Sequence, residues 1–240
     1  MSVKPILFSG SMIRAILDGR KTQTRRIIKD VPAGARYAGI HYASHQHDAW
    51  FFNSPSGPCK KKVWLDPGDL LWVRESHYMT DDGHDEYPLF IADGEETIAA
   101  HLLEVEAMEH AHPTVDWSSH KKLRPSIHMP RWASRLTLEV TDVRIQRLQE
   151  ISEGDAKAEG IAMLRQDRDG MQHWGLPDDG DGVHPRRASW AFARLWDSIN
   201  ASRGFGWDAN PWVAAITFRV IRQNIDEYLE SSARQAKEGA

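Results

Sequence analysis

The sequence predicts an α+β domain built on a small β-barrel. Strand-like segments alternate with helical ones, turn-rich segments of weak periodicity interrupt them, and the chain has no internal repeat and no glycine-rich phosphate loop after a strand. A chain of 240 residues is long enough to bury a sizeable core. No linker-like segment divides it, so we expect one domain over residues 1–222 and a polar tail over residues 223–240.

Hydrophobic periodicity and turn signals locate the regular elements. A capping box from Ser152 to Asp155 begins one helix, and Gly19 and Gly160 are placed to end helices. The strand after Arg135 alternates with period two and breaks near Asp142. The expected elements are, in order, a strand at 6–8, a helix at 11–18, strands at 70–75 and 136–145, helices at 152–160 and 187–200, and a strand at 211–221.

Three further segments are expected to be loop insertions. The segment near 30–62 is rich in glycine, histidine, serine and proline and is expected to be irregular. The segment near 77–120 is acidic with weak periodicity, and the segment near 165–187 is expected to be a mobile loop because of "GLPDDGDGVHP".

The charge pattern limits how the chain can meet nucleic acid. A protein that grips phosphates over its whole surface is usually basic, whereas this chain has a formal net charge of -4. Residues 13–29 and 121–147 are locally basic. They form one positive cleft if the fold brings them together, and two solvated faces if it does not.

Several function classes lack their motifs. The chain has no HExxH, CxxC or P-loop, and His41, His45 and His47 fall in a segment that does not favour a helix, so we expect no metal and no cofactor. A single cysteine, Cys59, fits a reducing compartment. With neither a secretory leader nor a long apolar run in the sequence, we expect a cytoplasmic protein with no membrane partner.

The segment "GRKTQTRR", residues 19–26, offers chemistry of its own. Lysine can act as a general base when burial or neighbouring cations lower its pKa, and such a base can activate a threonine hydroxyl. Lys21 and Thr24 are three residues apart, so a flat strand places them on opposite faces and only a turn or bulge lets them meet. From the residues alone, a solvated basic loop is the favoured interpretation of the segment.

Long motifs resemble those of the ASCH family, which has a PUA-like fold. They are "PILFSGSMIRAILDGRKTQTRR", "PGDLLWVRE", "LRPSIHMPRWASR", "ISEGDAKAEGI" and "LWDSINASRGFGWDANPWV". The chain is most similar to phage and prophage ASCH-domain proteins. The resemblance implies a small β-barrel flanked by helices, with a cleft beside the barrel that serves RNA binding or hydrolysis.

Small members of the family are similar to amidohydrolases that remove the acetyl group from N4-acetylcytidine. In "GxKTxTxR" the resemblance makes Lys21 and Thr24 catalytic, and the later helix makes Glu159 their partner. It implies a modified, N4-acylated cytidine-type nucleoside or nucleobase as substrate and needs no cofactor. The alternatives are a non-catalytic RNA- or DNA-binding module, and a structural role in which Glu159 is a surface charge. The oligomeric state is not predicted.

Further residues are expected to hold the substrate. Arg26 falls where the small enzymes keep an arginine, and Arg25, His128 and Arg131 are hydrogen-bond donors that could hold a polar base or an oxyanion. Glu75 completes the set; the alternatives for it are a surface charge or an ion pair with Arg74 or Lys21.

Overall fold

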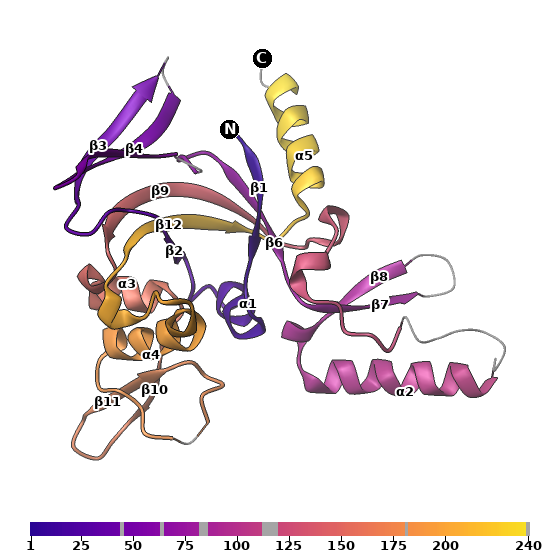
Figure 1. Ribbon diagram of the computed structural model, residues 1–240. Helices are drawn as coiled ribbons and strands as arrows, with labels where there is room; N and C mark the ends of the chain where they lie inside the picture. The colour runs from indigo at the N-terminus through magenta and orange to yellow at the C-terminus, as the bar shows by residue number, and fades with distance from the viewer. Residues whose placement is uncertain (44–45, 63–64, 82–85, 112–119, 181, 239–240) are drawn as a thin grey trace. The chain divides into compact units, whose positions relative to one another are not determined.

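The computed structural model describes residues 1–43, 46–62, 65–81, 86–111, 120–180 and 182–238 (Figure 1). The described residues form twelve strands and five α-helices, which confirms the predicted α+β class. The chain divides into two compact units, which are described separately: residues 1–2, 18–69 and 139–219 form the first, and residues 3–17, 70–138 and 220–240 form the second. The single domain expected over residues 1–222 stays a prediction.

The first unit contains most of the strands. Two of them, Thr137–Arg147 and Trp212–Ile221, each include two residues that are assigned to the second unit. Its elements are β2 (Gln23–Ile27), β3 (Arg36–Ala43), β4 (Gln46–Ser54), β5 (Gly57–Lys62), β9 (Thr137–Arg147), α3 (Glu153–Ala158), β10 (Ala162–Gln166), β11 (Gln172–Gly175), α4 (Ala188–Asn200) and β12 (Trp212–Ile221).

The strand β12 is central to this unit. It lies between β9 and β2 and pairs with β2 in antiparallel register, with Ile216 opposite Thr24. Its buried run from Val213 to Ile216 is almost fully enclosed, which fits a strand covered on both faces. The strand β9 shows the predicted break, because its side chains are buried up to Val140 and exposed at Asp142.

The helices α3 and α4 supply the hydrophobic core against these strands. The cluster comprises Leu148, Ile151, Ala156, Ile161, Leu176, Ala188, Ala191, Phe192, Trp196 and Val213. The helix α4 faces this core with residues spaced three or four apart, as the sequence predicts for an amphipathic helix. The indole of Trp196 also donates to the carbonyl of Phe205 at 2.7 Å, so the polar atom of this buried ring is satisfied.

The segment expected to be irregular near 30–62 is instead a three-stranded antiparallel sheet, β3–β4–β5. The prediction is wrong because the pairing of β3 with β4 shifts register twice, between Tyr37 and Gly39 and between His41 and Tyr42. Each shift interrupts the period-two alternation by which a strand is found in sequence. The side chains of His41, His45 and His47 lie outside the described residues.

The segment near 165–187 is also more regular than expected. It contains β11 and the end of β10, which pair as an antiparallel hairpin. Asp167 holds the turn by accepting hydrogen bonds from the backbone of Met171 and Asp169, at 2.8 and 3.1 Å.

The second unit is built on a parallel pair of strands. Its elements are β1 (Val3–Leu7), α1 (Gly10–Leu17), β6 (Leu70–Arg74), β7 (His77–Asp81), β8 (Glu86–Phe90), α2 (Glu95–Ala111) and α5 (Ile225–Glu238). The strands β1 and β6 pair in parallel, and β7 and β8 form an antiparallel hairpin. The expected insertion near 77–120 thus holds a hairpin and a long helix, and the polar tail is largely the helix α5.

The strands of the described residues form open sheets rather than a closed barrel. None of the described helices combines the length and the apolar character that crossing a membrane requires.

Candidate active site

The helix α3 positions Glu159 in the first unit. The predicted capping box is present: the hydroxyl of Ser152 accepts from the backbone N–H of Asp155 at 3.0 Å, and Asp155 accepts in return from Ser152. Glu159 is the residue at which the helix ends, and Gly160 follows with a φ of 101°, a conformation that favours glycine. Glu159 therefore sits at a sharply defined helix end.

The start of the "GRKTQTRR" segment binds this helix end with three successive residues. The guanidinium of Arg20 donates to the carbonyl of Gly160, the ammonium of Lys21 to that of Glu159 and the backbone N–H of Thr22 to that of Ala158, each at 2.9 Å. The last carbonyls of a helix lack intrahelical partners and carry a partial negative charge. The segment thus satisfies the end of α3, and the position of Lys21 is fixed by backbone atoms.

Lys21 is completely buried and its ammonium group makes a full set of hydrogen bonds. Nζ donates to the carbonyl oxygens of Gln23 and Glu159, both at 2.9 Å, and to Oε2 of Glu159 at 2.7 Å. An ammonium group has three hydrogens, so three acceptors hold it in one orientation. Lys21 and Glu159 are 138 residues apart in sequence, and the fold joins them as a buried ion pair.

Arg25 extends the pair into a network on one face of β2. Its NH1 group donates to Oε1 of Glu159 at 3.0 Å and to Oε1 of Gln23 at 2.6 Å, and its NH2 group is 3.3 Å from Oδ2 of Asp155. Arg144 binds the other oxygen of Asp155 at 2.9 Å. The network therefore alternates cations and carboxylates from Lys21 through to Arg144.

Burial and neighbouring charges together set the pKa values of the groups in this network. Desolvation lowers the pKa of Lys21 below its ordinary value, and the Glu159 carboxylate offsets this only in part, because the charges of Arg26 and Arg25 also oppose the ammonium form. Burial acts to raise the pKa of Asp155, but the hydrogen bond from Arg144 and the charge of Arg25 outweigh it, and the pKa of that carboxyl lies below its ordinary value.

Thr24 lies on the other face of β2. The hydrogen bond between Gln23 and Arg25 shows that these two side chains share a face, and period-two alternation directs the residue between them to the opposite face. Thr24 is 4% exposed and stands opposite Ile216. The segment is a regular strand here, so the geometry in which a turn brings Thr24 to the lysine is absent from β2 in this structure.

Arg26 follows on β2 and is half-buried. Burial lowers the pKa of its guanidinium, with a partial offset from the negative charge of Glu159. Arg26 is thus electrostatically coupled to the buried pair.

Three of the predicted site residues belong to the second unit. Glu75 is 2% exposed and binds Arg135, with both contacts at 2.9 Å, rather than Arg74 or Lys21. Arg74 instead donates to the carbonyl of Met129 at 3.2 Å. Burial raises the pKa of Glu75 above its ordinary value, because desolvation outweighs the bonds from Arg135.

The other two lie in short turns of the 120–138 segment. His128 is exposed at the end of a 3-10 turn, Ser126–His128. The guanidinium of Arg131 binds both carboxylate oxygens of Asp226, at 3.1 and 2.5 Å, in the first turn of α5. Arg131 is thus engaged in holding the start of α5.

Three members of the network, Gln23, Arg144 and Asp155, were not predicted as site residues. The sequence carries a local signal for two of them. Asp155 and Glu159 are four residues apart on α3, so both carboxylates face the same side. Gln23 and Arg25 alternate along β2 in the same way. Arg144 carries no comparable local signal, because its contact with Asp155 depends on how β9 packs beside α3.

Two hollows of about 530 Å³ each in the first unit are lined by other residues. One lies beside the β10–β11 hairpin and includes Arg165 and His184. The other lies at the start of β3 and includes Arg36, Tyr37, Arg147 and Trp212.

Comparison of the chain with protein-family models, with curated proteins and with solved structures finds no match in any of the three.

Proposed function

We propose that the chain is an ASCH-type domain with PUA-like ancestry that hydrolyses the acyl amide of an N4-acylated, cytidine-type nucleoside or nucleobase. The observation that supports this most directly is the buried bond of 2.7 Å between Lys21 and Glu159. These are the lysine and the glutamate that the resemblance implies, and they meet although only a short motif predicted the glutamate.

In the proposed reaction Lys21 is the general base. Burial lowers its pKa, as a base that works near neutral pH requires, and Glu159 is placed to take up the proton that the ammonium group must lose. The hydroxyl of Thr24 then attacks the acyl carbon while Lys21 accepts the hydroxyl proton. Lys21 returns this proton to N4 as the C–N bond breaks, and water hydrolyses the acyl-threonine ester.

This reaction requires a change at the start of β2. Thr24 and the Lys21 amine point to different faces of the strand in the structure, and Lys21 is inaccessible to solvent. The proposal therefore includes a shift of residues 21–24 on substrate binding. Lys21 precedes the first residue of β2 and bridges to Glu159 rather than to β12. The shift therefore has to break the backbone hydrogen bonds of Thr22 with Ala158 and Phe218 and the pairing of Gln23 and Thr24 with β12.

A second candidate function is a non-catalytic RNA- or DNA-binding module. It is favoured by the complete set of acceptors around Lys21, since an ammonium held by three acceptors and closed to solvent suits a structural role. In that case the network only stabilises the packing of β2 against α3.

An assay of N4-acetylcytidine hydrolysis, in which chromatography detects the released cytidine, distinguishes the two candidate functions. We expect turnover by the unmodified protein and its loss in Thr24→Val, which keeps the shape of the side chain but removes the hydroxyl. Thr22→Val is the matched control, because Thr22 is a neighbouring, exposed threonine on the same segment. Equal activity in both variants would exclude Thr24 as the nucleophile.

A further inference from the structure

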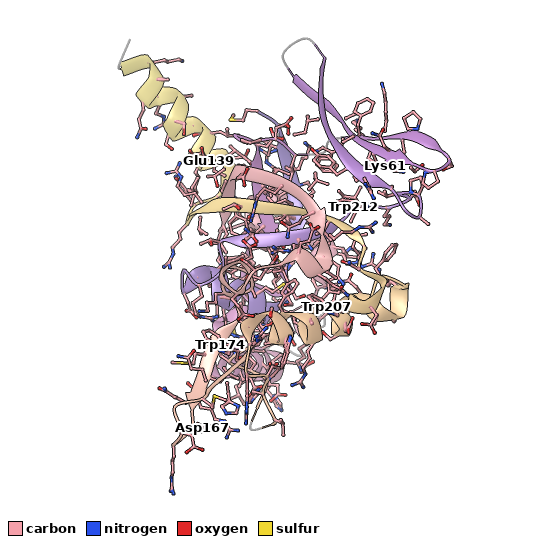
Figure 2. All side chains as sticks on the ribbon, turned by 90° about the vertical axis from the view of Figure 1, so that its left-hand side faces the viewer. Lys61, Glu139, Asp167, Trp174, Trp207 and Trp212 are labelled. Carbon is pink, nitrogen blue, oxygen red and sulfur yellow. The ribbon has the colours of Figure 1, made fainter. Side chains whose placement is uncertain are left out.

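The three-stranded sheet β3–β5 has two chemically different faces. Tyr37, Phe52 and Trp212 pack together, with ring centres 5.6 Å apart for Tyr37–Phe52 and 5.3 Å for Phe52–Trp212. Figure 2 shows this sheet, which carries Lys61, next to Trp212. Residues directly opposite in register share a face and successive residues alternate, so Phe51 lies on the face turned away from Trp212. We call this the outer face.

The outer face combines an aromatic ring with three cations. The register places Lys60 opposite Phe51, Lys62 opposite Ala49 and Arg36 opposite Asn53. The ammonium of Lys60 lies 5.0 Å from the centre of the Phe51 ring. From the level of Asn53 to that of Ala49 the track is about 13 Å long, at roughly 3.3 Å per residue.

These three cations differ from the arginines that form ion pairs elsewhere in the described residues. Arg20, Arg25, Arg131, Arg135 and Arg144 each bind a carboxylate. Over the part of the chain that the structure describes, no carboxylate pairs with Arg36, Lys60 or Lys62, and all three are exposed.

The local charge balance also favours an anionic ligand at this sheet. Residues 31–62 contain four Lys or Arg residues and one acidic residue, Asp48, although the whole chain has a net charge of -4. A positive potential is therefore concentrated on this sheet, which suits an extended polyanion.

A hollow lies next to Arg36, on the side of the sheet where Tyr37 and Trp212 pack rather than on the outer face. Arg147 and the carboxylate residue Glu150 also line it, and the guanidinium of Arg147 lies 4.5 Å from the ring centre of Trp212. The indole N–H of Trp212 is buried and has no hydrogen-bond partner among the described residues. Aromatic rings and guanidinium planes are the surfaces on which unstacked bases pack.

We propose that the outer face of β3–β5 binds a single-stranded polynucleotide, with phosphates at Arg36, Lys60 and Lys62 and a base stacked at Phe51. Single-stranded nucleic acid is commonly held by a positive surface that follows the backbone together with aromatic side chains that stack on bases. This binding surface is independent of Lys21 and of the proposed hydrolysis, and its test involves no catalysis.

Lysines on an edge strand have one other common use, since they prevent two sheets from pairing edge to edge. The strand β5 is an edge of this sheet. The two roles give different results when Lys60 and Lys62 are neutralised: the first predicts weaker nucleic-acid binding, and the second predicts self-association with unchanged binding.

The experiment is fluorescence anisotropy with labelled oligo(U), oligo(dT) and a duplex of the same length, over a series of salt concentrations. Three phosphate contacts predict a slope of log K against log salt of about -2 for a single strand. We expect Lys60→Gln/Lys62→Gln to reduce the slope to about -0.7. We expect Phe51→Leu, which keeps an apolar side chain but removes the ring, to weaken binding about tenfold.

Arg165→Gln/Arg168→Gln is the matched control, because it removes two exposed cations from the β10–β11 hairpin of the same unit. Loss of binding in the lysine variant with retention in the control supports the proposal. Equal loss in both variants, duplex binding as tight as single-strand binding, or no binding at low salt overturns it. A preference between oligo(U) and oligo(dT) identifies the polymer as RNA or DNA.

Discussion

Replacing Lys21 by methionine tests the buried network of the first unit in depth. Methionine keeps much of the aliphatic volume of lysine but removes the ammonium group, so Oε2 of Glu159 and two backbone carbonyls lose their donor. Removing one partner of a buried ion pair costs about 3–5 kcal/mol, because the other charge is left without compensation. Arg25 still binds the second oxygen of Glu159, so we expect a loss near the lower end, about 3 kcal/mol.

For a chain of this size, 1 kcal/mol corresponds to roughly 2–4 °C in Tm, so Lys21→Met is expected to lower Tm by about 6–12 °C. Urea denaturation gives the free energy, and hydrogen exchange of the β2 and α3 amides shows whether the loss is confined to this unit. Adding Glu159→Gln completes a double-mutant cycle, in which we expect a coupling of at least about 1.5 kcal/mol. A loss under about 1 kcal/mol, or additive single effects, would refute the ion-pair reasoning.

Three further predictions concern stability. Removing the cation in Arg144→Gln is expected to lower the free energy of unfolding by about 0.5–1 kcal/mol at neutral pH. Because the pKa of Asp155 is lowered in the folded protein, this difference should disappear as pH falls through the folded-state pKa of Asp155. A difference that persists when urea denaturation is repeated in acid contradicts this prediction. Arg135→Gln leaves Glu75 buried without its cation and is expected to cost about 2 kcal/mol of stability at pH 7. Because burial raises the pKa of Glu75, the cost should shrink as pH falls through the folded-state pKa, and thermal melts with an equal loss at pH 7 and in acid would count against this assignment. Gly160→Ala places a side chain on a residue with positive φ at the end of α3 and is expected to lower the free energy of unfolding by about 1–2 kcal/mol. An unchanged urea midpoint would contradict this prediction.

Local signals in the sequence predicted α3 and β9, two of the elements that build the candidate site, but not the strand β2. The capping box at Ser152, the glycine at 160 and the period-two alternation of the strand after Arg135 each depend on a few neighbouring residues, and each is present in the structure. The meeting of Lys21 with Glu159 came from a resemblance over a short motif, and the side-chain bond between them agrees with it.

The sheet β3–β5 could not be predicted for a physical reason. Its two register shifts and its glycines hide the alternation, and its stability depends on Phe52 and Trp212 packing across 160 residues of sequence. Such long-range contacts leave no periodic trace in the segment itself. The partner of Glu75 was missed for a similar reason, since Arg135 is 60 residues away in the sequence.

The orientation of Thr24 is the point at which sequence, structure and proposed chemistry differ most. The sequence left open whether the segment turns, and the structure has a regular strand that separates Thr24 from the Lys21 face. A catalytic role for both residues therefore implies that substrate changes the start of β2. Hydrogen exchange at residues 21–24 with and without N4-acetylcytidine measures this change directly.

The central claim is that Lys21, Thr24 and Glu159 form the catalytic centre of an amidohydrolase. Release of cytidine and acetate from N4-acetylcytidine, compared between the unmodified protein, Thr24→Val and Thr22→Val, tests it most directly. The proposed mechanism predicts turnover by the unmodified protein and by Thr22→Val, and none by a folded Thr24→Val. A correctly folded, unmodified protein that leaves a panel of acylated nucleosides intact would contradict it.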